Sequence, residues 1–237
     1  DLVFGQLFPN DVEKIKRGTL PGTPSYFQKD YKSNKLTFGD SHAISAWLEG
    51  SKCSRNDGLT LNGALKRGFH TFIDEMEMAE INTLRFYLGN IDVRHHLCRL
   101  YEDVNERLSQ TQKLAVRYVE EVLKMKNKYG IRHVGIVELL PIEHECRRLP
   151  KTGNYKGQPY WGSAQERMQV RTVFNNTLKK LMDKFGGFSI IHWPEEYTFR
   201  EDVTIPLKNL TGVFKNHPEE DITFRKGMLR FEVMEKP

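Results

Sequence analysis

The chain has 237 residues, of which 38% are hydrophobic and 28% charged, a balance typical of a soluble globular domain. No apolar run approaches the ~20 residues that a membrane-spanning helix needs, so we expect no membrane insertion. The three cysteines, Cys53, Cys98 and Cys146, are widely separated and odd in number. This argues against a disulfide framework and favours a reducing, cytoplasmic compartment.

The formal net charge is +5, which is basic without being extreme. Such a charge favours a polyanionic partner, either a nucleic acid or an acidic glycan, through long-range attraction. The lysines and arginines are nevertheless spread along the chain rather than gathered in one tract. An ordinary solvated surface is therefore the alternative explanation, and the sequence leaves both open.

In chain order, residues 1–34 hold several prolines and glycines, which predict an irregular arm packed on a domain that spans 35–237. Within that domain the sequence predicts strands at 35–38, 59–61, 83–88, 133–138 and 188–192, and helices at 41–48, 69–81, 108–129 and 163–185. This alternation predicts an α/β fold: a three-layer α/β/α sandwich around a mostly five-stranded parallel sheet, of the flavodoxin-like type.

A long polar segment, 143–161, interrupts the regular pattern and mixes basic with aromatic residues. Arg147, Lys156 and Tyr160 are examples, and such side chains can hold a phosphate or stack on a sugar or base. A solvated lid without a binding role is the alternative.

Two polar motifs follow predicted strands: Gly39-Asp40-Ser41-His42 and Gly89-Asn90-Ile91-Asp92. In an open parallel sheet, the carboxyl ends of the strands form the binding crevice. A serine that opens a helix there has free N–H groups around it, which suits a nucleophile whose attack generates an oxyanion. A simple helix cap is the alternative function for such a serine. We expect no metal and no cofactor, because His95-His96 and His144-Glu145-Cys146 lack a third ligand at a diagnostic spacing.

These motifs carry a resemblance to a known family. The run from Leu36 to His42 resembles the first block of SGNH (GDSL-type) hydrolases, Asn62-Gly63 resembles the second, and the run from Phe86 to Asp92 resembles the third. The likeness covers about residues 35–192. A His after the serine, together with an Arg-x-His after the third block (Arg94-His95-His96), resembles one branch of that family.

The resemblance implies roles for particular residues. Ser41 would be the nucleophile and Asp40 would shape its turn. The backbone N–H groups of Ser41 and Gly63, with the Asn90 amide, would form the oxyanion hole. The remaining candidates for substrate binding around these blocks are His42, Asp92 and Arg94.

The family's Asp-x-x-His block, which supplies the general base, is not found near the C-terminus of this chain. A serine hydroxyl is a poor nucleophile unless a base takes its proton. The candidate bases are His217, then His96, then His192.

The sequence supports three functions. The first is a serine hydrolase of the esterase or deacylase class, which acts on an acyl ester of a small molecule or glycan. The second is an acyl- or glycosyltransferase, or a nucleic-acid-modifying protein, on the same scaffold, and the third is a catalytically inert binding module. The fold alone does not choose among them.

Overall fold

The structure is a computed structural model, and it describes residues 33–40, 42, 43, 46, 52–73, 78–139, 156, 157 and 161–192. Several predicted features therefore lie outside the described residues. These are most of the arm at 1–34, Ser41, most of the helix at 41–48, most of the segment 143–161, and His217.

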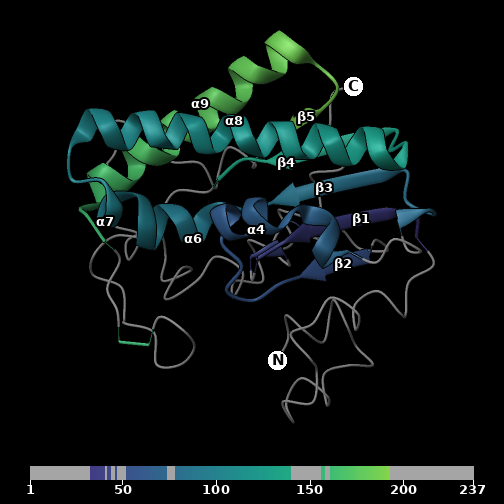
Figure 1. The fold of residues 1–237 in the computed structure, drawn as a ribbon, viewed down its shortest axis with the longest axis horizontal. Coiled ribbons are helices and arrows are strands. Elements are labelled where there is room, and N and C mark those ends of the chain that lie inside the picture. The colour runs from purple at the N-terminus through teal and green to yellow at the C-terminus, as the bar shows by residue number, and fades with distance from the viewer. Residues whose placement is uncertain are drawn as a thin grey trace, which may run out of the picture.

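Five parallel strands form the sheet (Figure 1). They are β1 (Lys35–Gly39), β2 (Lys52–Arg55), β3 (Thr83–Tyr87), β4 (His133–Val137) and β5 (Ser189–Ile191). Their order is β2-β1-β3-β4-β5, and every neighbouring pair is parallel. This is the flavodoxin-like order, so the predicted α/β fold with a five-stranded parallel sheet is confirmed. The direction of winding reverses between β1 and β3, and ligands bind at the carboxyl ends of the strands at such a reversal.

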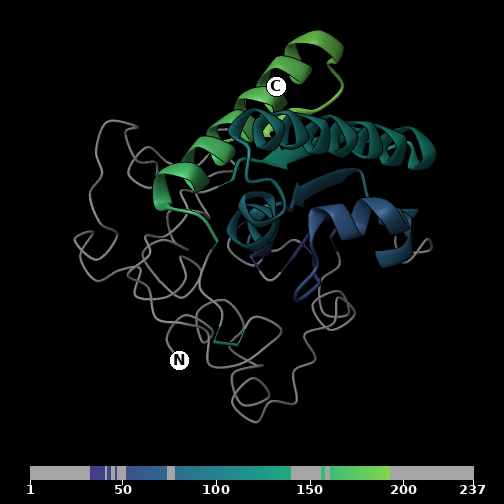
Figure 2. The same ribbon diagram turned by 60° about the vertical axis from the view of Figure 1, so that its left-hand side comes forward.

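The described helices lie mostly in the connections that follow β2, β3 and β4. They are α4 (Leu61–Arg67), the 3₁₀ helix η3 (Phe69–Phe72), α6 (Asn90–Asp92), the π-helix η4 (Val93–Leu97), α7 (Cys98–Leu100), α8 (Val104–Tyr129) and α9 (Ala164–Phe185). Helix α8 lies alongside α9 and also contacts α4, so these three helices form one layer (Figures 1 and 2). None of the described helices combines the length and the apolar character that a bilayer span requires.

Local chemistry explains where the two long helices begin and end. The Asp103 carboxylate accepts a hydrogen bond from the Glu106 N–H at 2.8 Å, which caps the start of α8. Gly130, at a φ of 64°, ends that helix in the left-handed conformation. A capping box between Ser163 and Glu166 begins α9. The predicted helices at 108–129 and 163–185 are thus confirmed, with α8 starting earlier at its cap.

One predicted strand before β3 is wrong, and one predicted helix differs at its start. The predicted strand at 59–61 is the start of α4, because the Thr60 hydroxyl caps that helix by accepting from the Gly63 N–H. The true second strand is β2, which lies earlier in the chain. Within the predicted helix over 69–81, residues 69–72 form the short η3 and Ile73 is extended, so the helix is not continuous from residue 69. Met78 is helical, and residues 74–77 lie outside the described residues.

An aromatic cluster joins the sheet to the helices. Phe38 of β1 lies 5.9 Å from Phe86 of β3, measured between ring centroids, and Phe86 lies 5.2 Å from Phe69 of η3. Tyr118 of α8 continues the cluster to Phe174 of α9 at 6.2 Å. All five side chains are buried, and aromatic rings contribute large apolar areas to a core. This packing fixes β1 beside β3, and so sets the geometry of the edge where they end.

Candidate active site

The carboxyl ends of β1 and β3 approach each other unusually closely. Gly39 pairs with Tyr87, and the Asp40 N–H donates to the Tyr87 carbonyl at 3.4 Å. A Cβ atom on Gly39 would lie only 2.2 Å from that same carbonyl oxygen. Position 39 therefore requires glycine, because a backbone atom on the neighbouring strand occupies the space of any side chain.

Asp40 organises the turn that follows β1. Its Oδ1 accepts a hydrogen bond from the His42 backbone N–H at 2.7 Å and lies 2.8 Å from Nδ1 of the His42 ring. The Ala43 N–H donates to the Asp40 carbonyl at 3.0 Å, which closes the turn. A carboxylate that binds the backbone two residues ahead is the typical device of an Asx turn. Ser41 is the residue between these two anchors in the sequence.

Arg94, which lies in η4, contacts the side chain of this turn's histidine. Its guanidinium Nη1 contacts Nε2 of His42, and both side chains are buried. A guanidinium has donors and no acceptor, so His42 Nε2 must accept and Nδ1 must carry the proton toward Asp40. The three residues form one chain from carboxylate to imidazole to guanidinium. The lone pair of His42 is then already engaged, and His42 serves as a positioning residue rather than as a base.

Asn90 follows β3 at the same edge. Gly89 precedes it with a φ of 114°, in the left-handed region that favours glycine, and so turns the chain directly from the strand into α6. The Asn90 side chain is 1% exposed, yet its amide Nδ2 has no hydrogen-bond partner among the described residues. Buried polar atoms are nearly always paired, so this donor at the strand ends is available to a ligand.

Asp92 ties α6 to the start of α4. Its two carboxylate oxygens accept from the Leu61 N–H at 2.7 Å and from the Asn62 N–H at 3.1 Å. The next N–H, that of Gly63, donates to the Thr60 hydroxyl at 3.0 Å. The first N–H groups of α4 are thus engaged within the fold. Because the Gly63 N–H already donates to the Thr60 hydroxyl, the structure does not favour Gly63 as an oxyanion donor.

Burial raises the pKa of Asp92. Desolvation raises the pKa of its carboxyl from 3.8 to about 6, against the hydrogen bonds from Leu61 and Asn62, and the charge of Asp40 raises it further. A raised pKa in the folded state means that Asp92 contributes stability below pH 3.8, which is lost as the pH rises through about 6. The loss is about 3 kcal/mol for a shift of this size.

This gives a measurable pH dependence. Urea unfolding between pH 4 and pH 7 should show the free energy of unfolding of the wild type falling by about 2 kcal/mol relative to Asp92→Asn, which cannot titrate. Carboxyl ¹³C shifts would give the pKa of Asp92 directly. Parallel stability curves for the two proteins would show that Asp92 keeps an ordinary pKa.

His96 lies beside Asp92 around a cavity of about 290 Å³. Residues of α4, η4 and α8 also line this cavity, among them Lys113 and Arg117. The His96 Nδ1 lies 3.0 Å from the Arg99 guanidinium. Burial and then the charge of Arg99 lower the pKa of His96, so its ring is neutral at neutral pH. Because a guanidinium only donates, the Nδ1 lone pair of His96 is engaged by Arg99.

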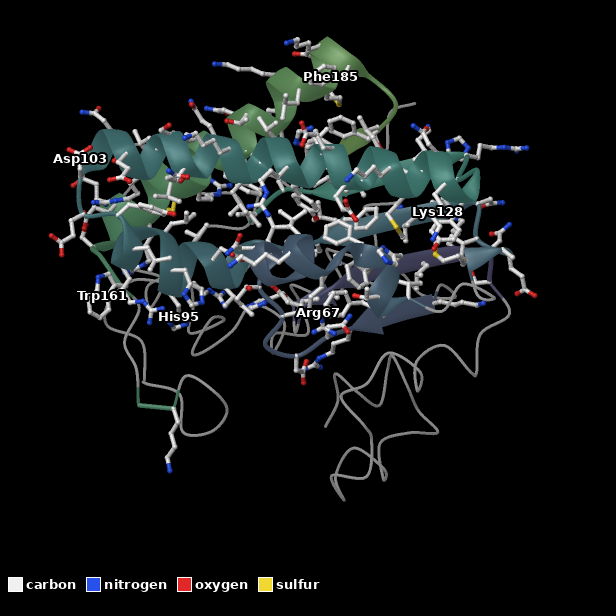
Figure 3. All side chains as sticks on the ribbon, in the orientation of Figure 1. Arg67, His95, Asp103, Lys128, Trp161 and Phe185 are labelled. Atoms are coloured by element: carbon white, nitrogen blue, oxygen red, sulfur yellow. The ribbon has the colours of Figure 1, made fainter. Side chains whose placement is uncertain are left out.

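A π-helical turn at this edge is a feature that sequence reasoning missed. Residues 93–97 form η4 between the short helices α6 and α7, and π-turns occur frequently at functional sites. The Arg94 carbonyl accepts from the Trp161 N–H at 3.0 Å, and Figure 3 shows Trp161 near His95. The end of the polar segment 143–161 is therefore fixed next to the residues of the site.

Gly162 shows how closely that segment docks. Its φ is 75°, and an added Cβ would lie 2.9 Å from the Cys98 Cβ. The fully buried Arg167 donates to the Gly162 carbonyl from α9. These contacts hold the chain against α7, where a larger residue would not fit.

His192, the third candidate base, lies at a different place. Its Nδ1 is 2.9 Å from the Glu138 carboxylate, which also binds Lys179 at 2.8 Å. Both Glu138 and His192 directly follow their strands, β4 and β5. In the sheet order, β5 is three strands from β1, a separation of roughly 14 Å at the usual strand spacing. The structure therefore does not bring His192 together with Asp40 and His42.

Asn56 is a further residue that sequence reasoning missed, because β2 was predicted in the wrong place. It follows β2, and its backbone N–H donates to the Gly39 carbonyl at 2.9 Å. Its side-chain amide also lies 3.4 Å from the same carbonyl. Asn56 thus supports the end of β1 from the opposite side to β3. The turn-forming run Asn56-Asp57-Gly58 is the feature of the sequence that could have located the end of this strand.

No protein-family model and no curated protein matches the sequence. Among solved structures, the chain is similar to an extracellular lipase from Streptomyces rimosus, with 12% identity over 85% of this chain and 99% of that one, at a TM-score of 0.45. An acetylxylan esterase from Geobacillus stearothermophilus matches with 8% identity over 87% and 95%, also at 0.45. A salicylyl-acyltransferase from a tetracycline biosynthetic pathway matches with 12% identity over 87% and 55%, at 0.38. All three TM-scores are below 0.5, so these likenesses assign no function to this chain.

Proposed function

We propose that this protein is an SGNH-type serine hydrolase of the esterase class, with Ser41 as its nucleophile. The observation that carries the proposal is the buried Asn90 amide without a partner, which lies at the same sheet edge as the Asp40–His42 turn. The sheet reverses its winding at this point, where α/β proteins bind ligands.

In this proposal the Ser41 hydroxyl attacks the acyl carbon of an ester, and the carbonyl oxygen becomes an oxyanion. The Ser41 N–H and the Asn90 amide donate to that oxygen. Donors fixed before the reaction stabilise the charge where it develops and need no reorganisation. Asp40, His42 and Arg94 hold the turn that presents the serine, as positioning residues. The base takes the Ser41 proton and gives it to the departing alcohol as the intermediate collapses to the acyl-enzyme. Water then attacks the acyl-enzyme, which releases the acid and regenerates Ser41.

The base is assigned by elimination among the candidates. His42 has its lone pair engaged by Arg94, and His192 lies strands away with Glu138. His217 and His96 remain. We assign the role first to His217, in the C-terminal part of the chain where this family keeps its base. His96 is second, because its Nδ1 would first have to release the exposed contact with Arg99.

Acyl transfer is a second candidate function, and one observation favours it. The cavity of about 290 Å³ beside Asp92 is lined by Lys113 and Arg117, which would attract an acceptor that carries a negative charge. An acidic glycan is an acceptor of this class. The transferase would share the acyl-enzyme step and differ only in which hydroxyl resolves it.

Product analysis on acetyl esters separates these functions. The wild-type protein would be incubated with p-nitrophenyl acetate and with an acetylated oligosaccharide, each with and without an unacetylated uronic-acid oligosaccharide. Acetate release above the buffer rate in water supports the hydrolase, whereas acetylation of the added oligosaccharide supports the transferase. An absence of both, with esters of two to eight acyl carbons, would overturn acyl chemistry and leave the binding module.

A further inference from the structure

A second cavity, of about 500 Å³, opens at the amino ends of the strands, at the edge of the sheet opposite the candidate active site. The residues that line it come from β1, β3, α8, β4, β5 and the loops before β4 and β5. In Figure 3, Lys128 marks the end of α8 nearer this edge, whereas Trp161 lies at the other end of the molecule. The cavity is thus separate from the Asp40–His42 turn.

The charges around this cavity all have one sign. Lys35, Arg85, Lys126 and Arg132 line it together with His133, and no carboxylate is among the described residues that do so. These cations come from β1, β3, α8 and the loop before β4, so the fold gathers positive charge from separate elements around one cavity. Such a concentration of charge attracts an anion.

Arg85 is a buried cation in the lining of this cavity. Its side chain is 4% exposed in the middle of β3, yet it lines the cavity. A guanidinium is the group best suited to bind phosphate through two parallel hydrogen bonds. Hydroxyl groups of Thr83 and Ser189 also line this space, although each already donates within the fold, Thr83 to the Asn82 Oδ1 and Ser189 to the Val134 carbonyl.

The size of the cavity points to a small ligand. Small-molecule sites are commonly about 300–1,000 Å³, and 500 Å³ lies within this range. Val134 and Phe188 add an apolar part to the lining. Four cations around one half-open cavity match several negative charges on a compact molecule better than they match the regular spacing of a nucleic-acid backbone.

We propose that this cavity binds a small ligand that carries two or more phosphate groups. The arginines would bind phosphate oxygens in bidentate fashion and the lysines would act as point charges. The proposal concerns the edge of the sheet opposite Ser41 and does not depend on the esterase assignment.

Calorimetric titration with tripolyphosphate at 150 mM salt tests the proposal. Lys126→Gln and Arg132→Gln should each weaken binding about tenfold, since each removes a charge-assisted contact. Lys124→Gln is the matched control. It removes one positive charge from α8, the helix that carries Lys126, at a residue that does not line the cavity. The control should bind like the wild type.

Thermal unfolding gives a second readout that also reports folding. Tripolyphosphate should raise the Tm of the wild type and of Lys124→Gln, but not that of the Lys126→Gln/Arg132→Gln double variant. Equal weakening by all three single variants would overturn the proposal, because net charge alone would explain it. So would the absence of saturable binding, or binding of a single-stranded oligonucleotide that tripolyphosphate does not displace.

Discussion

Ser41→Ala is expected to abolish ester hydrolysis, lowering kcat by about 10⁴-fold or more, because removal of a nucleophile leaves only the residual effect of binding and of the oxyanion donors. The KM of any residual reaction should change little, since the hydroxyl acts mainly in the bond-forming step. Initial rates on p-nitrophenyl acetate measure both constants. Ser189→Ala is the control, because Ser189 begins β5 at the opposite edge of the sheet, and it should keep full activity.

The same assay assigns the base. His217→Ala should lower kcat nearly as much as Ser41→Ala, and added imidazole should restore part of the rate, because the two residues act as a unit. His96→Ala should leave most of the rate intact if His217 is the base. A large loss in His96→Ala with none in His217→Ala would transfer the role to His96. Wild-type rates in Ser41→Ala would remove the serine mechanism altogether.

Asn90→Ala is expected to lower kcat by about 10²- to 10³-fold with little change in KM, which is the usual effect of removing one oxyanion donor. The stability of the folded protein should hardly fall. The Asn90 amide nitrogen has no partner among the described residues, so its removal breaks no hydrogen bond that the structure shows for it. Steady-state kinetics and urea unfolding of the same preparation measure both effects.

Asn175→Ala provides a matched control for this substitution. Asn175 is also a buried asparagine, but its side chain accepts from the Leu139 N–H at 3.0 Å and donates to the Leu139 carbonyl at 3.1 Å. Its removal should cost about 1–3 kcal/mol of unfolding free energy and leave kcat per folded molecule unchanged. The opposite pattern, with Asn90→Ala unstable and fully active, would make Asn90 a structural residue.

The parts of the fold that the sequence predicted correctly carry strong local signals. Helix α8 combines a cap at Asp103, buried residues every three or four positions, and Gly130 as its stop. Strand β2 lacks such a signal, because Lys52-Cys53-Ser54-Arg55 has charged ends and little apolar character. It becomes a strand through its pairing with β1, a tertiary effect that local propensity does not report.

The candidate site could be predicted only in part. The two strand-end motifs indicated the correct edge of the sheet, because parallel strands end together. The contact between His42 and Arg94, residues 52 positions apart, depends on the π-turn η4, for which no sequence signal was available. The unpaired amide of Asn90 and the cap that engages Gly63 likewise follow from three-dimensional packing rather than from spacing.

Labelling with a fluorophosphonate probe tests the central claim, an activated serine at position 41, most directly. Such a probe forms a stable adduct with a serine hydroxyl that a base has activated. Peptide mass spectrometry should locate the adduct on Ser41 in the wild type and in Ser189→Ala, and should find none in Ser41→Ala. An unlabelled Ser41, in a reaction where a known serine esterase is fully labelled, would contradict the serine mechanism.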